Sequence, residues 1–151
     1  MWKNKKVIYI IVPFAFLVLW ITYSINQPPK WFGQSTDGKW EADFNSEVTS
    51  PKGYWSGRIY SEQDHRVEVQ TIALSKNGKL IHDLDVNETV TKNQEIEYLS
   101  TTKTFSDLQD EYVVQVTWKD SSGTYQDVIH LSPQTRYFVL PKVLFGSHLS
   151  C

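Results

Sequence analysis

The chain has 151 residues, of which 15 are Lys or Arg and 17 are Asp or Glu, for a net charge of −2. Four of the basic residues lie in the first 30 residues, which contain no acidic residue, so residues 31–151 hold 11 basic and 17 acidic residues and carry a net charge of −6. That acidic balance argues against nucleic acid as a partner, because binding nucleic acid needs clustered Lys and Arg. The single cysteine, Cys151, excludes an intrachain disulfide.

Residues 7–25 form the most hydrophobic stretch, 19 residues without a charge. As a helix rising ~1.5 Å per residue this stretch is about 28 Å long, close to the ~30 Å hydrocarbon core of a bilayer. We therefore expect a single-pass transmembrane signal-anchor helix over residues 7–25. The alternative is a cleaved signal peptide, but bulky residues such as Trp20 and Tyr23 stand where a cleavage site needs small ones.

Charges around this stretch predict its orientation. Residues 1–6 contain three lysines, which favours a cytoplasmic N-terminal tail and places the rest of the chain outside, at the cell membrane. Residues 26–38 include two consecutive prolines and are predicted to be a linker and a loop leading into the first strand. Residues 39–151 are predicted to form an extracytoplasmic β domain. Trp31 and Phe32 are either interfacial anchors or part of that domain.

Beyond residue 39 the sequence alternates between apolar and polar residues, which is the period of half-buried strands. The alternating runs begin at Trp40, Trp55, Val67, Leu80, Glu95, Tyr112 and Thr124, and an extended segment with Tyr137, Val139 and residues 143–145 follows Pro133. Asn77-Gly78 is typical of a two-residue hairpin turn, and Ser106 to Glu111 is predicted to form a helical turn. About seven or eight short strands of this spacing predict an antiparallel, immunoglobulin-like β-sandwich.

Residue types that carry chemistry form no recognisable site in the sequence. The four histidines have no partner at metal-ligand spacing: His65, His82, His130 and His148. Asp83, Asp85 and Asn87 match the first ligand positions of a calcium loop, but Glu88 stands where that loop needs glycine, so a solvated strand face is the simpler interpretation. The sequence has no nucleophile elbow and no phosphate-binding loop. We therefore predict no catalytic residue, no metal site and no cofactor.

The start of the predicted β domain carries one family resemblance. Gly33-Gln34-Ser35 followed by Trp40-Glu41-Ala42-Asp43-Phe44 resembles the opening of small uncharacterised envelope proteins of Bacillus-like Gram-positive bacteria. This resemblance implies a membrane-anchored or secreted β domain outside the cytoplasm. It assigns no functional residue.

A second resemblance rests on Gly38-Lys39-Trp40, which is similar to the Gly-x-Trp start of the first strand in lipocalin-like barrels. It implies a closed barrel as the alternative to the sandwich, with Arg136 packed over the tryptophan. It also implies a ligand cavity lined by Trp40, Tyr112, Trp118 and Arg136.

Together these observations predict a binding or interaction module of the cell envelope. Its partners are the membrane, through the N-terminal helix, and an unknown envelope protein or polymer. The first alternative is a lipocalin-like carrier of a small apolar ligand. The second is an envelope hydrolase, for which acids on one strand face, such as Glu95 and Glu97, are candidates.

Overall fold

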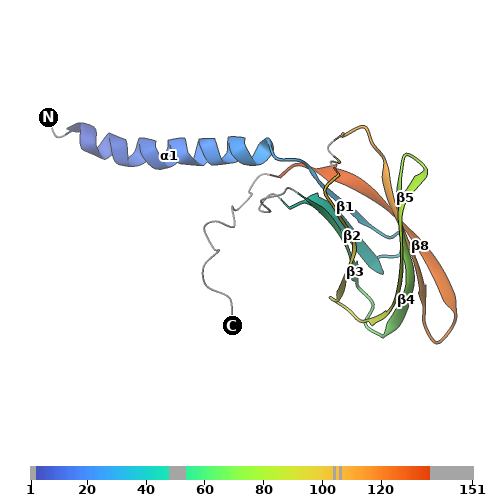
Figure 1. Ribbon diagram of the computed structural model, residues 1–151. Coiled ribbons are helices and arrows are strands. Elements are labelled where there is room, and N and C mark those ends of the chain that lie inside the picture. Colours follow the sequence, from blue (N-terminus) through green and yellow to red (C-terminus); the bar gives the residue numbers. More distant parts are fainter. Residues whose placement is uncertain (1–2, 48–53, 104, 106, 137–151) are drawn as a thin grey trace. The chain divides into compact units, whose positions relative to one another are not determined.

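The computed structural model describes residues 3–47, 54–103, 105 and 107–136, with the backbone alone for residues 3–8 (Figure 1). Within these ranges the elements are α1 (Lys3–Ile25), β1 (Lys30–Gln34), β2 (Trp40–Ser46), β3 (Trp55–Ser61), β4 (Val67–Lys76), β5 (Lys79–Val90), β6 (Glu95–Thr101), β7 (Tyr112–Lys119) and β8 (Thr124–Gln134). All of the strands belong to one compact unit, Pro29–Gln134, and the helix lies outside this unit.

Helix α1 includes the whole of the hydrophobic stretch over residues 7–25. Among the residues that the structure describes, however, no helix is both long and apolar enough to cross a membrane. The predicted transmembrane signal-anchor, and with it the single-pass arrangement, is therefore wrong.

The eight strands form one antiparallel sheet in the order β5-β4-β7-β8-β1-β2-β3-β6. The sheet curls until its two edge strands, β5 and β6, face each other without pairing, which makes a nearly closed barrel (Figure 1). The predicted immunoglobulin-like sandwich of two sheets is therefore wrong. The alternative prediction, a lipocalin-like closed barrel, is closer to the structure, but the sheet does not close between β5 and β6.

Strand β8 explains why one sheet forms where two were expected. Residues 124–131 pair with β7, and residues 132–134 pair with β1. With 11 residues the strand is long enough for both neighbours, so it joins the two halves of the sheet. The alternation of apolar and polar residues is the same in a sandwich and in a barrel, because one face of each strand is buried in both.

The order of the strands differs from the sequential order of an up-and-down barrel such as a lipocalin. After β3 the chain crosses to the far side of the sheet and forms the β4–β5 hairpin. It then returns to pair β6 with β3, and crosses once more to pair β7 with β4. The barrel is therefore held together by pairings between strands that lie far apart in the sequence.

Most of the predicted strands are confirmed, and six of them begin at the expected residue: β2, β3, β4, β6, β7 and β8. The hairpin turn at Asn77-Gly78 is confirmed as well, with φ angles of 50° and 74°. Strand β1 was missed, because it is only five residues long and lies within residues 26–38, where the prolines indicate a linker. Trp31 in this strand is 1% exposed, so it belongs to the barrel.

Two other predicted elements have different outcomes. Leu108 and Gln109 form a turn and not the helical turn expected between Ser106 and Glu111. The extended segment expected around Tyr137, Val139 and residues 143–145 lies outside the described residues.

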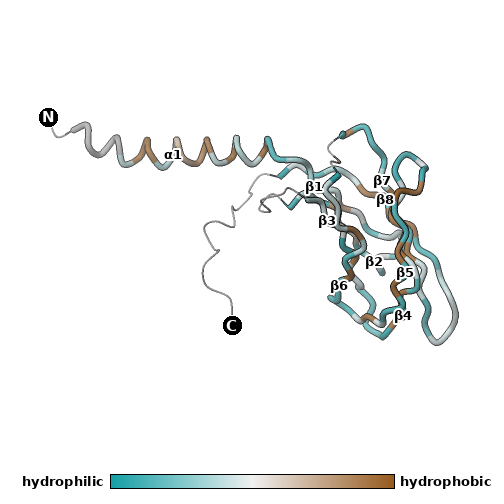
Figure 2. The backbone as a smooth tube through the Cα atoms, viewed as in Figure 1, coloured by the Kyte–Doolittle hydropathy of each residue, from teal (hydrophilic) through white to brown (hydrophobic). Residues whose placement is uncertain are grey.

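Aromatic side chains fill the interior of the barrel. Tyr98 is 1% exposed, and seven further aromatic residues are at most 8% exposed: Trp31, Trp40, Phe44, Trp55, Phe105, Tyr112 and Trp118. Their rings contact one another at centroid separations from 4.7 Å, between Trp31 and Tyr112, to 6.1 Å, between Trp40 and Trp118, the range of favourable aromatic pairs. Figure 2 shows hydrophobic and hydrophilic positions following one another along the strands that enclose this core.

Candidate functional site

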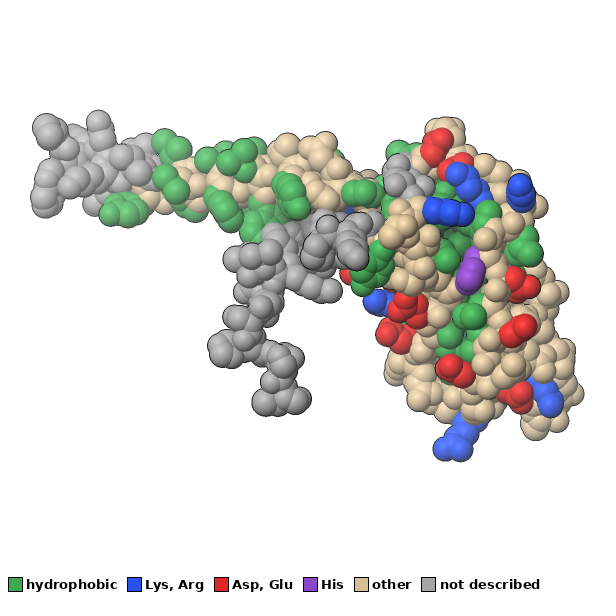
Figure 3. All heavy atoms as spheres, in the orientation of Figure 1, with side chains coloured by type: hydrophobic (Ala, Val, Ile, Leu, Met, Phe, Trp, Pro, Cys, Tyr) green, Lys and Arg blue, Asp and Glu red, His purple; other side chains and the backbone are tan. Residues whose placement is uncertain are grey.

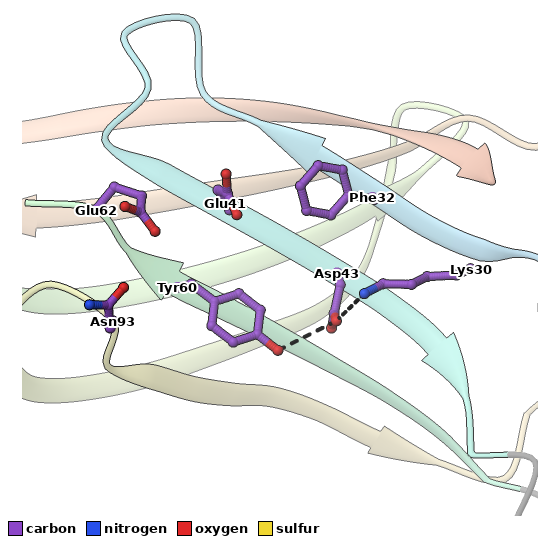
Figure 4. Close-up of a pocket in the computed structure, with 7 residues that line it drawn as sticks. All are labelled: Lys30, Phe32, Glu41, Asp43, Tyr60, Glu62 and Asn93. Carbon is purple, nitrogen blue, oxygen red and sulfur yellow. Dashed lines mark hydrogen bonds and ion pairs between the residues drawn. The ribbon is translucent and has the colours of Figure 1, made fainter. Parts of the chain in front are cut away.

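An open pocket of about 310 Å³ lies on the outer face of the barrel, over β1, β2 and β3 (Figure 4). The side chains that line it are Lys30, Phe32, Glu41, Asp43, Tyr60, Glu62 and Asn93. The alternation of β2 produces this arrangement, because Trp40, Ala42 and Phe44 are buried in the core while the residues between them face outward. The strand register then places Phe32 opposite Asp43, and Glu41 opposite Tyr60.

Asp43 is the most unusual residue of the pocket, because its side chain lies on the outer face and is nevertheless only 5% exposed. The ammonium group of Lys30 lies 2.9 Å from Oδ2, and the hydroxyl of Tyr60 donates a hydrogen bond of 3.4 Å to the same oxygen (Figure 4). Oδ1 has no hydrogen-bond partner within the described part of the chain. A buried carboxylate that lacks part of its hydrogen bonds is costly for the fold, so a structure that retains one calls for an explanation.

Tyr98 holds the backbone of Asp43 from the core side of the sheet. Its hydroxyl donates a hydrogen bond of 3.1 Å to the backbone carbonyl of Asp43. The ring lies against Gly57 on β3, so closely that a Cβ at position 57 would stand 2.5 Å from ring atom Cζ. The position of the Asp43 backbone therefore depends on a glycine one strand away.

Two tyrosines near Asp43 have raised pKa values. Burial is the main cause in both, and the negative charge of Asp43 is the second cause. Together they raise the pKa of Tyr60, and they raise the pKa of Tyr98 well above its ordinary value. Both phenols therefore stay protonated at neutral pH and act as hydrogen-bond donors.

The charges and rings of the pocket favour a cation. Three carboxylates, those of Glu41, Asp43 and Glu62, face one ammonium group, that of Lys30, which gives the lining a formal charge of −2. The rings of Phe32 and Tyr60 add two aromatic surfaces, and aromatic rings attract cations through their quadrupoles. Lys30 Nζ already lies 5.8 Å from the centroid of Phe32. The arrangement can thus hold an ammonium or guanidinium group, and it has no excess positive charge for an anion.

The residues predicted for an interior ligand cavity do not line this pocket. Trp40, Tyr112 and Trp118 lie together in the core, each at most 1% exposed and in contact with other rings. Arg136 follows β8 and lies outside the compact unit that holds the other three. The cation that does lie over Trp118 is Lys39, whose Nζ is 5.1 Å from the ring centroid.

The residues tested for chemistry are dispersed over the barrel. His65 lies 3.8 Å from Asp120, and His130 lies 3.4 Å from Glu111. Asp83, Asp85 and Asn87 are exposed along β5, Glu95 and Glu97 are exposed on β6, and His148 lies outside the described residues. Within the described ranges no three His, Cys, Asp or Glu side chains gather closely enough to hold a metal ion.

The sequence alone does not reveal the outer pocket. Asp43 occupies a polar position in an alternating strand, which normally indicates a solvated side chain. Its burial comes from Lys30, Phe32 and Tyr60 on neighbouring strands, and only the strand register brings these residues to it. The Lys30 position also fell within the predicted linker.

None of the protein families compared with the chain matches it, and its sequence matches none of the curated proteins compared with it. The function of the pocket therefore has to be inferred from its own residues.

Proposed function

We propose that this protein is a binding module whose outer pocket holds a lysine or arginine side chain of a partner protein. The observation that carries this proposal is the lining of the pocket, in which three carboxylates, those of Glu41, Asp43 and Glu62, face the single ammonium group of Lys30 beside two aromatic rings. An ammonium or guanidinium group supplies N–H donors and a positive charge that this lining lacks. Glu41 and Glu62 provide further acceptors around it.

The open form of the pocket supports a side chain as the ligand. The pocket lies on the outer face of a sheet, where a partner can project one residue into it while the rest of the partner stays outside (Figure 4). Exposed ion pairs contribute about 0.2–1 kcal/mol each, and exposed cation–π contacts about 0.5–1 kcal/mol. A single lysine side chain therefore binds no more tightly than about 1 mM, which corresponds to about −4.1 kcal/mol, and the rest of the affinity comes from other contacts with the partner.

The interior of the barrel supports this function over that of a carrier of apolar ligands. A carrier needs an internal space, whereas aromatic rings fill this interior. Trp31 packs against Tyr112 at a centroid separation of 4.7 Å, and Trp40 packs against Trp118 at 6.1 Å. No observation favours the hydrolase. A location outside the cell, the cytoplasmic tail at residues 1–6 and an envelope partner stay predictions.

A titration of the full chain with N-acetyl-lysine amide, followed by amide NMR at low ionic strength, tests the proposal. We expect saturable shifts centred on Asp43, Tyr60 and Glu62, with a dissociation constant near or above about 1 mM. The uncharged analogue N-acetyl-norleucine amide has the same aliphatic chain without the ammonium group and is expected to leave these signals unchanged. Shifts that are equal for both compounds would show that the pocket does not select a cation.

Variants separate the pocket from general electrostatic attraction. The double variant Glu41→Gln, Glu62→Gln removes two charges from the lining and is expected to weaken binding of the lysine amide at least several-fold. Glu88→Gln on β5 removes an exposed carboxylate elsewhere on the barrel and serves as the control. If Glu88→Gln weakened binding of the lysine amide by half or more of the free-energy loss in the double variant, the overall charge of the barrel would hold the cation, and the proposal would fail.

A further inference from the structure

The two edge strands of the sheet leave an open seam in the barrel. Strands β5 and β6 follow each other in the chain through the turn at residues 91–94, yet they are the two ends of the strand order and form no ladder with each other. Away from the turn they diverge, and contacts between them are sparse compared with those of paired strands. The facing edges of β5 and β6 therefore present backbone N–H and C=O groups that no neighbouring strand pairs.

The hydrophobic core reaches the surface at this seam. Three apolar side chains that pack against the core are only partly buried, and all three lie on the edge strands: Leu84 and Val86 on β5 and Leu99 on β6. At the wide end of the seam a pocket of about 270 Å³ is lined by Ile81, His82, Leu99, Ser100, Thr101, Lys103 and Phe105. Ile81 is 39% exposed there, whereas Phe105 is 8% exposed and contacts Phe44 in the core at a centroid separation of 4.9 Å.

The outer rims of the seam are acidic. Asp83 and Asp85 are exposed on β5, and Glu95 and Glu97 are exposed on β6. In the view of Figure 3, hydrophobic side chains come to the surface of the barrel with carboxylates on both sides of them. The seam thus has an apolar floor and two rows of negative charge above it.

We propose that an extended segment of a partner protein adds to the barrel as a strand in this seam, with apolar and basic residues alternating along it. Its backbone pairs with the free edges of β5 and β6, since a strand lies about 4.7–4.9 Å from each of its neighbours. Its inward side chains cover Leu84, Val86 and Leu99, and the largest of them enters the pocket beside Ile81. Its outward Lys or Arg side chains lie between the acidic rows.

A second copy of the same chain is a poor occupant for the seam. Pairing two β5 edges would bring Asp83 and Asp85 of one copy close to the same residues of the other, and like charges opposite each other on paired strands are destabilising. The charge of the seam therefore selects a basic partner.

Hydrogen exchange of the full chain tests the proposal, with a heptapeptide of alternating lysine and valine as the probe. At saturating peptide, amides on the facing edges of β5 and β6 are expected to exchange about tenfold more slowly, while those of β8 keep their rates. A peptide of the same sequence that is N-methylated at both its lysines and its valines has no backbone N–H donors for pairing and is expected to lose this protection. Peptide binding without slower exchange in β5 and β6 would overturn the proposal.

Charge reversals provide a second test. The double variant Asp85→Lys, Glu97→Lys is expected to weaken the peptide about tenfold or more, whereas Glu111→Lys, a reversal at a side chain that is 66% exposed next to β7, is expected to leave affinity within about twofold. Equal losses in both variants would overturn the proposal. Slower exchange in β5 and β6 at high protein concentration without peptide would also overturn it, because it would assign the seam to a second copy of the chain. Tighter binding of octanoate than of the peptide would overturn it too, because it would assign the seam to a small apolar ligand. The seam does not depend on the outer pocket, so Glu41→Gln, Glu62→Gln should leave the peptide response unchanged.

Discussion

Replacing Gly57 by alanine is expected to destabilise the barrel, because the ring of Tyr98 occupies the place of the new methyl group. A Cβ at position 57 lies 2.5 Å from Cζ, 2.6 Å from Cε2 and 2.8 Å from the hydroxyl oxygen of Tyr98. Contacts under 3.0 Å require one of the groups to move. The ring cannot turn into solvent without leaving the core, since Tyr98 is 1% exposed.

The size of the effect follows from two losses. Overpacking of a well-packed core costs about 1–3 kcal/mol. A displaced ring also loses its 3.1 Å hydrogen bond to the carbonyl of Asp43, which adds about 0.5–1.5 kcal/mol. We therefore expect Gly57→Ala to lower the free energy of unfolding by about 2–4 kcal/mol, with a fall in Tm of about 4–8 °C for each kcal/mol.

Urea unfolding of the full chain, followed by tryptophan fluorescence, measures this loss. The variant Tyr98→Leu removes the ring, so the double variant Gly57→Ala, Tyr98→Leu is expected to lose at least about 1 kcal/mol less than the sum of the single losses. An unchanged midpoint for Gly57→Ala would refute the reasoning. Strict additivity in the double variant would refute it as well, because the clash would then not involve Tyr98.

Two further predictions concern charges on the barrel. A hydrogen bond from Lys76 lowers the pKa of Asp110, and a backbone N–H from Ser122 lowers the pKa of Asp120, both from 3.8. The stabilisation from these two carboxylates is fully present above their pKa in the unfolded chain and is lost as the pH falls through their lower pKa values in the folded chain. Tm should therefore fall as the pH drops below about 4. A Tm that stays level from about pH 5 to pH 2 would contradict this. Asp127→Ala leaves the indole N–H of the buried Trp118 without its acceptor, which lies 2.6 Å away. This variant is expected to lower the free energy of unfolding in urea by about 1–3 kcal/mol. The control Gln126→Ala, at the exposed neighbouring residue of β8, should lower it by less than about 0.5 kcal/mol.

The sequence predicted the strands but not their neighbours. Alternation in the run from Tyr112 to Trp118 indicates correctly that one face is buried, and Asn77-Gly78 indicates the hairpin turn. Neither signal tells which strands pair. The two-sheet prediction failed at β8, whose two parts pair with β7 and β1, because the alternation along a strand does not show where its partner changes.

The candidate site was harder to predict than the fold. Asp43 has the sequence context of a solvated residue, and its burial depends on three neighbours that the strand register brings together. One of those neighbours, Lys30, lies on a five-residue strand next to two prolines, where the local sequence indicates a linker.

The most direct test of the proposed function is an experimental structure of the full chain with N-acetyl-lysine amide. The account predicts that the ammonium group lies within hydrogen-bond distance of the carboxylates of Glu41, Asp43 or Glu62, with its aliphatic chain against Phe32 or Tyr60. The outer pocket should be the site that fills first as the concentration rises. Occupation of the barrel interior, or binding only at carboxylates outside the pocket, would contradict the account.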